Sequence, residues 1–202
     1  MERRLITIGG ASAVAAGSLA LLGFVLQLVA PRDDLERATD PLWLAAHAAE
    51  LAMAVLCLLY VVGLRAASAQ RLTAAGDICF ALCIVGLALL VGFRTRFLAT
   101  YVAARIDHVF AREFITNEYG PGLIAFVVLL ATLLVGWIGF TLLTGRAAGF
   151  GAPLRIALVV TVLLLPWLPV VPGGPILVAG SVLLRRARDA TPTRPHPEVL
   201  VR

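Results

Sequence analysis

The stretch PGLIAFVVLLATLLVGWIGFTLLT, residues 121–144, contains no charged side chain. A helix needs roughly 20 predominantly apolar residues to cross the hydrocarbon core of a bilayer. Because that core holds no water to bond exposed backbone groups, a crossing segment must be helical or belong to a closed barrel. This stretch therefore predicts a membrane-spanning helix.

Three more stretches have a similar reach, namely 5–30, 42–64 and 72–93, and a fifth, 154–184, is interrupted by prolines. Of the 202 residues, 60% are hydrophobic and only 14% are charged, against roughly 25% charged in a soluble domain. The chain therefore predicts an all-α, polytopic transmembrane helical bundle over residues 1–188, with no room for a second soluble domain.

The fifth stretch decides the number of spans. As one straight helix it would be about 46 Å long, and prolines break helices. The sequence Pro172-Gly173-Gly174-Pro175 has the composition of a turn. We therefore predict a short Pro/Gly hairpin, 154–170 and 174–187, which gives six spans. The alternative is a single kinked span and five spans in all.

Arginine placement predicts the orientation. All 17 basic residues are arginines, and cytoplasmic segments of membrane proteins carry an excess of positive charge. With the N-terminus inside, eleven arginines are cytoplasmic and six lie outside, so we predict that both termini are cytoplasmic. The cytoplasmic arginines are Arg3, Arg4, Arg65, Arg71, Arg146, Arg155, Arg185, Arg186, Arg188, Arg194 and Arg202.

Composition also predicts the setting. Arginine without lysine, together with abundant Ala, Leu, Gly and Pro, is typical of a GC-rich coding sequence and favours a bacterial plasma membrane. Because the arginines flank apolar spans, we expect the lipid bilayer and its anionic headgroups at the cytoplasmic face as partners, and no nucleic acid. The Pro-rich segment 189–202 predicts a disordered cytoplasmic tail.

Residues 94–117 do not have the sequence pattern of a simple loop. Leu98, Val102, Ile106 and Val109 recur at helical spacing, with charged residues between them. This pattern predicts an amphipathic helix that lies in the outer interface, or a third span that continues above the membrane.

The strongest candidate for a polar site is the pair His47 and Glu50, three residues apart on one face of the second span. Ionisable groups inside a membrane are costly and are therefore candidates for function. Arg94 or Arg96, at the outer end of the third span, could pair with Glu50, and His108 lies on the same side. The alternative is that the pair only holds helices together.

Signatures of common enzymes are absent. The sequence has no nucleophile elbow, no phosphate-binding loop and no His-Glu-x-x-His zinc motif, so we expect no catalytic residue, no metal and no cofactor. Gly9, Ala13 and Gly17 follow one another at four-residue spacing, which lets another helix approach closely. That helix could belong to the same chain or to a second copy, so a homo-oligomer through these residues is possible.

The layout is similar to that of other proteins in one respect. Pro41-Leu42-Trp43-Leu44, His47, Glu50 and Gly63-Leu64, followed by Gly76, Gly86 and Gly92, resemble an uncharacterised family of small multi-span bacterial membrane proteins. The resemblance implies a helical bundle in the plasma membrane and implies no reaction.

Three functions remain open. The first, which we favour, is a binding, sensing or accessory role with a polar site near the outer face. The second is a small-solute or proton-coupled transporter, whose broken helices the prolines of the last hairpin could supply, although no second half with matching breaks is present. The third is a membrane-embedded enzyme that uses His47 and Glu50 as base and acid, or as metal ligands, near the outer surface.

Overall fold

A computed structural model describes residues 2–30, 40–69, 72–106, 121–163 and 173–189. All regular structure in these ranges is helical, which confirms the predicted fold class at the level of all-α. The helices are α1 (Glu2–Val29), α3 (Pro41–Ser68), α4 (Ala74–Ile106), α6 (Pro121–Gly145), α7 (Ala152–Leu163) and α8 (Gly173–Asp189).

Four helices are long and apolar enough to cross a membrane, and they match the four uninterrupted apolar stretches of the sequence. The segments are Glu2–Val29, Pro41–Ser68, Ala74–Arg96 and Phe126–Gly145. They make the chain compatible with an integral membrane protein.

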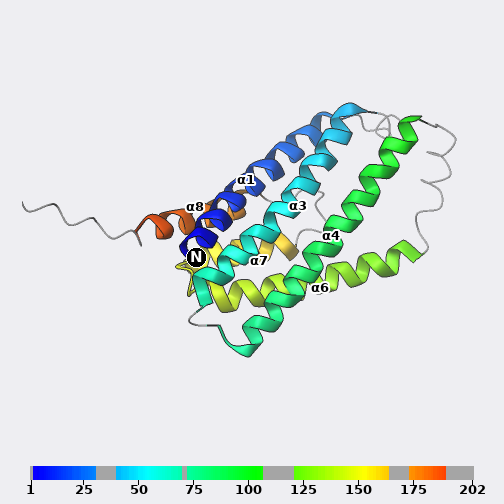
Figure 1. The fold of residues 1–202 in the computed structure, drawn as a ribbon. Helices are drawn as coiled ribbons and strands as arrows, with labels where there is room; N and C mark the ends of the chain where they lie inside the picture. Colours follow the sequence, from blue (N-terminus) through cyan, green and yellow to red (C-terminus); the bar gives the residue numbers. More distant parts are fainter. Residues whose placement is uncertain (1, 31–39, 70–71, 107–120, 164–172, 190–202) are drawn as a thin grey trace, which may run out of the picture.

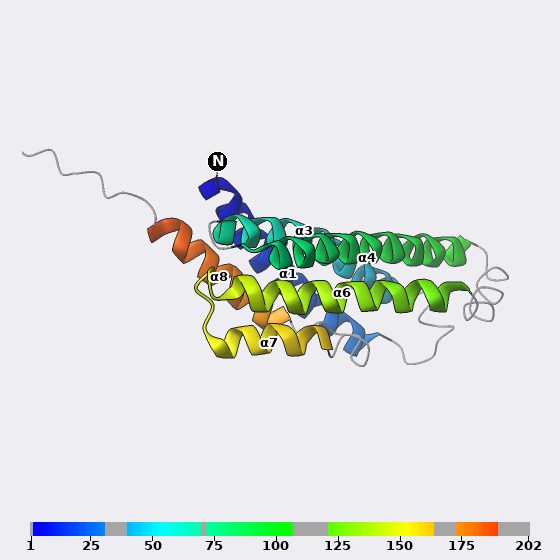
Figure 2. The same ribbon diagram turned by 90° about the horizontal axis from the view of Figure 1, so that it is seen from below.

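The long helices run side by side and define two ends of the molecule (Figures 1 and 2). The near end holds the N-terminus, the end of α3 and the end of α8, while the far end holds the end of α1 and the start of α3. Helix α1 packs between α3 and α8, α4 packs on α3 and α6, and α7 joins α6 to α8.

Helices α7 and α8 occupy the place of the predicted hairpin. Helix α7 has 12 residues, or about 18 Å, and Figure 2 shows it ending well short of the far end. The predicted continuation of this helix to residue 170 lies outside the described residues, as does Pro172 of the predicted turn. The other three residues of that turn, Gly173, Gly174 and Pro175, instead form the first turn of α8. The described part of α7 therefore begins at the near end, and α8 ends there.

Glycines allow α1 to lie very close to both of its neighbours. A Cβ on Gly63 of α3 would lie 2.5 Å from the Cα of Gly9, and a Cβ on Gly10 would lie 3.1 Å from the carbonyl oxygen of Gly180 in α8. Gly17 faces the backbone of Gly173, at the first turn of α8. Such close backbone approach is typical of membrane helices packed through small residues.

Gly9, Ala13 and Gly17 are therefore all used for packing within the chain. Gly9 faces α3, whereas Ala13 and Gly17 face α8, and all three residues are buried. A homo-oligomer through these residues stays a prediction, and it would have to compete with the intrachain contacts.

Helix α3 begins where the sequence provides a cap. The Asp40 carboxylate accepts hydrogen bonds from the backbone N–H groups of Leu42 (2.7 Å) and Trp43 (3.1 Å), and Pro41 occupies the first helical position. An acidic cap satisfies the free N–H groups of the first turn, and proline there loses no hydrogen bond. This cap fixes the start of the helix that carries His47 and Glu50.

Helix α4 is continuous through Ile106, so it extends ten residues beyond the segment that ends at Arg96. Of the two structures predicted for residues 94–117, the described part is thus a continuation of the long helix. Residues 107–117 lie outside the described residues, as do His108 and residues 190–202 of the predicted tail.

Candidate functional site

Four side chains from three helices meet at the far end of the bundle. Gln27 comes from the last turns of α1, His47 and Glu50 from the first turns of α3, and Arg94 from α4. We call these four residues the far-end cluster. Since α1 and α3 are neighbours and α3 packs on α4, the fold brings them together although they are far apart in the sequence.

The Glu50 carboxylate is the centre of the far-end cluster. Its Oε1 accepts a hydrogen bond of 2.6 Å from Gln27 Nε2. Its Oε2 lies 2.7 Å from Arg94 Nη1 and 3.1 Å from His47 Nδ1. The carboxylate is thus satisfied from three directions.

Burial makes these contacts energetically important. Glu50 is 8% exposed and His47 is 5% exposed, and an unpaired charge at such a position would be strongly destabilising. The arginine offsets the charge of Glu50, and its side chain is 23% exposed, more than that of Glu50 or His47. Charge-assisted hydrogen bonds of this kind are about twice as strong as neutral ones.

His47 has two charged neighbours among the described residues. Its Nδ1 lies 3.1 Å from Glu50 Oε2 and 3.5 Å from Arg94 Nη1, so the same nitrogen faces an acceptor and a donor. Which contact is a hydrogen bond depends on the tautomer of the ring. The indole of Trp43 lies edge-on to the imidazole, with ring centroids 4.8 Å apart and an interplanar angle of 88°.

Gln27 is the member of the cluster that the sequence reasoning missed. Its Oε1 is buried and accepts no hydrogen bond from the part of the chain that the structure describes. The signal was present, because Gln27 is the largest polar side chain in the apolar stretch 5–30.

Among the predicted site residues, the structure brings together His47, Glu50 and Arg94. Arg96 lies two positions further along α4 with an exposed side chain, and Glu50 pairs with Arg94 instead. His108 lies outside the described residues. No group of three or more His, Cys, Asp or Glu side chains suited to a metal occurs within the described ranges.

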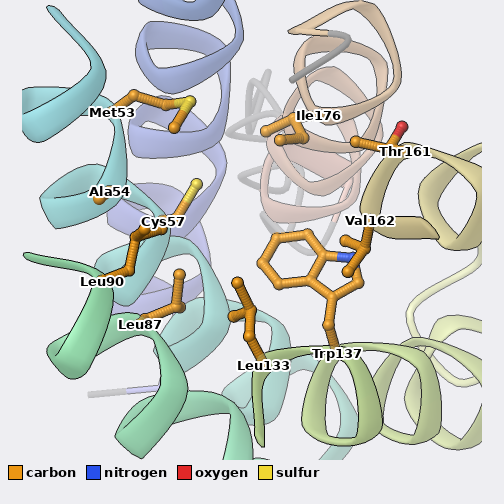
Figure 3. Close-up of a pocket in the computed structure, with 10 residues that line it drawn as sticks. All are labelled: Met53, Ala54, Cys57, Leu87, Leu90, Leu133, Trp137, Thr161, Val162 and Ile176. Atoms are coloured by element: carbon orange, nitrogen blue, oxygen red, sulfur yellow. The ribbon is translucent and has the colours of Figure 1, made fainter. Parts of the chain in front are cut away.

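A small cavity lies in the middle of the bundle, where the α7–α8 pair meets α3, α4 and α6 (Figure 3). It has a volume of about 20 Å³, and its lining includes Met53, Cys57, Trp137 and Ile176. A single water molecule needs roughly 10–15 Å³, together with polar partners. This cavity is therefore too small and too apolar to hold a solute in the conformation described.

Comparison of the chain with family models, with curated proteins and with solved structures found no match. The resemblance in layout noted above therefore stays a prediction.

Proposed function

We propose that the chain is an integral protein of a bacterial plasma membrane, with the near end cytoplasmic, and that it has a binding or sensing role. The far-end cluster is the working part and lies near the outer face. The observation that carries this proposal is the sharing of one carboxylate oxygen, Glu50 Oε2, by Arg94 Nη1 and His47 Nδ1.

The shared oxygen makes the cluster responsive to charge. With His47 neutral, the charges of Glu50 and Arg94 offset each other. A proton on His47 would place two cations on one buried carboxylate oxygen, and like charges at such distances repel each other strongly in a poorly solvated site. Arg94, which is the most exposed of the three, would be displaced, and the contact between α3 and α4 at the far end would loosen.

A proton is therefore the input that we assign to the cluster. Imidazole is the side chain whose charge ordinarily changes between about pH 5 and 8. The charged groups that face His47 in the described ranges are Glu50 from α3 and Arg94 from α4, while α1 contributes the neutral Gln27.

The edge contact between Trp43 and His47 provides a direct test. A protonated imidazole quenches indole emission at contact distance. The full-length protein in nanodiscs is titrated between pH 8 and pH 5, and the emission that is lost in the Trp43→Phe variant is taken as the signal of Trp43. We expect a reversible decrease in this signal on acidification, and the decrease should be absent in His47→Gln.

A pH-dependent decrease in Trp43 emission that persists unchanged in His47→Gln would contradict the proposal that the cluster responds to a proton on His47. A purely structural role of the pair would also leave a signature. In that case His47→Ala would lower the membrane yield and the thermal stability together with the pH response. A working site instead predicts that the pH response is lost while yield and stability stay near normal.

A proton-coupled or small-solute transporter is the second candidate, and the α7–α8 pair favours it. Helices that end within the depth of the membrane are used by many transporters to build their central sites. Proteoliposomes that contain an internal pH-sensitive dye distinguish the two candidates. A transporter dissipates an imposed pH gradient with a rate that falls in His47→Gln, whereas a sensor leaves the gradient as it is in protein-free vesicles.

A further inference from the structure

Helix α1 carries a basic groove at the near end that plays no part in the far-end cluster. The groove is shallow and open, and it is lined by Arg3, Arg4, Thr7 and Ile8. The Ile8 side chain is 50% exposed. Cationic groups thus lie directly next to exposed apolar surface.

The same face of α1 continues as a strip of small side chains. Ala11, Ala15 and Ser18 are all exposed, and their spacing places them in line with Arg4 on a helix of 3.6 residues per turn. The opposite face of α1 holds the glycines that contact α3 and α8. The strip from Thr7 to Ser18 is about 16 Å long, which is close to half of a hydrocarbon core roughly 30 Å thick.

The surroundings of the groove are basic. Helix α8, which packs along α1, adds Arg185, Arg186 and Arg188 at the same end, and Arg3 Nε donates a hydrogen bond to the carbonyl oxygen of Ala187. The acidic residues of these two helices at this end are Glu2 and Asp189. Glu2 points about 160° away from Arg4 around α1.

We propose that this face of α1 binds one anionic phospholipid. The phosphate contacts Arg4 and Arg3 in the groove, and one acyl chain lies along Ala11, Ala15 and Ser18. Guanidinium groups match phosphate oxygens with paired donors, and a strip of small side chains leaves room for a chain between the bulkier neighbours. This is a defined binding site for a single lipid, in addition to the diffuse attraction of all the arginines to anionic headgroups.

Lipid binding is measured by native mass spectrometry of the full-length protein, titrated with palmitoyl-oleoyl phosphatidylglycerol or with the corresponding phosphatidylcholine. We expect one phosphatidylglycerol to bind more tightly than the rest. Arg4→Gln should weaken this binding about fivefold, since one arginine near an anionic surface has an effect of that size. Arg4 is preferred for the first variant, because Arg3 also contacts α8.

Two matched control variants distinguish binding at this lipid site from general effects of removing an arginine or enlarging an exposed alanine. Arg146→Gln removes an exposed arginine at the same end, and Ala131→Leu enlarges an exposed alanine on α6; neither should change the tight binding. Ala15→Leu should weaken it, because the larger side chain fills the strip. The proposal would be overturned by an unchanged affinity in Arg4→Gln or by an equal loss of affinity in Arg146→Gln. Displacement of the lipid by millimolar inorganic phosphate would also overturn it, because the groove would then be a site for free phosphate.

Discussion

At the scale of single residues, two arginine–carboxylate pairs of similar length stabilise opposite ends of the bundle in different surroundings. Arg94 and Glu50 are 2.7 Å apart at the far end, with side chains 23% and 10% exposed. Arg65 and Asp77 are 2.8 Å apart at the near end, with side chains 48% and 52% exposed. Water and salt screen the second pair much more than the first.

This difference in exposure leads to a prediction for stability. Replacing one partner of the far-end pair, as in Arg94→Gln, leaves a buried charge and should lower the free energy of unfolding by about 3 kcal/mol. Replacing both, Glu50→Gln with Arg94→Gln, should cost less than the sum of the single changes. Chemical unfolding of all four proteins in detergent measures the coupling.

The near-end pair is the control for this experiment. Its coupling, measured with Arg65→Gln and Asp77→Asn, should stay below about 1 kcal/mol. Equal coupling energies at the two ends would mean that burial does not govern the strength of these pairs, and the electrostatic account of the far-end cluster would then be wrong.

At the scale of helices, α4 and α6 meet through small residues and sulfur. A Cβ on Gly136 would lie 2.8 Å from the Cα of Cys83, and a Cβ on Gly139 would lie 2.5 Å from the Sγ of Cys79. Cys79 and Cys83 therefore pack as small side chains against glycines of the neighbouring helix.

The contact between Gly139 and Cys79 predicts a rescue. Gly139→Ala should destabilise the protein by about 1–3 kcal/mol through overpacking. Cys79→Ala removes the sulfur that the new methyl group would meet and leaves a Cβ at 3.4 Å, an ordinary contact. Combining the two changes should therefore restore most of the stability, measured by thermal unfolding followed by circular dichroism.

A matched variant is available for this test. Gly92→Ala introduces the same methyl group on α4, where no atom lies within 4 Å, so it should not destabilise. If Cys79→Ala fails to relieve Gly139→Ala while Gly92→Ala is neutral, the close approach of α4 and α6 is not as described.

The helices show which parts of the structure can be read from the sequence. Length and apolarity were enough to predict the four long helices, and the prolines and glycines around residue 173 predicted a break. The order of packing was not predictable, because α1 has glycines on two faces and the sequence does not say that Gly9 meets α3 while Gly17 meets α8. For the same reason Gln27 was missed, since its partner Glu50 is known only once α1 and α3 are adjacent.

At the scale of the whole molecule, the start of α7 and the end of α8 both lie at the near end, together with the N-terminus (Figure 2). Helix α6 leads into α7 through a tight turn, in which Gly149 has a φ of +85° and Phe150 N donates to the carbonyl oxygen of Gly145. A positive φ suits glycine. The turn therefore returns the chain into the bundle from the near end.

This arrangement predicts the labelling pattern of introduced cysteines. Gly151→Cys and Asp189→Cys should react with a membrane-impermeant maleimide only after the cells are permeabilised, whereas Pro41→Cys should react in intact cells. The unmodified protein is the control, because Cys57 and Cys83 are buried and Cys79 is partly buried. Labelling of Asp189→Cys from outside would instead support the single kinked span.

The contact of α8 with α1 has a consequence for biogenesis. Gly17 and Gly173 are separated by most of the chain, and a ribosome that adds about 5–20 residues per second needs roughly 8–30 s to make the intervening segment. During this interval the glycine face of α1 that receives α8 has no partner within the nascent chain. Helix α1 is thus made well before α8, and its packing on that side is completed only after α8 has been made.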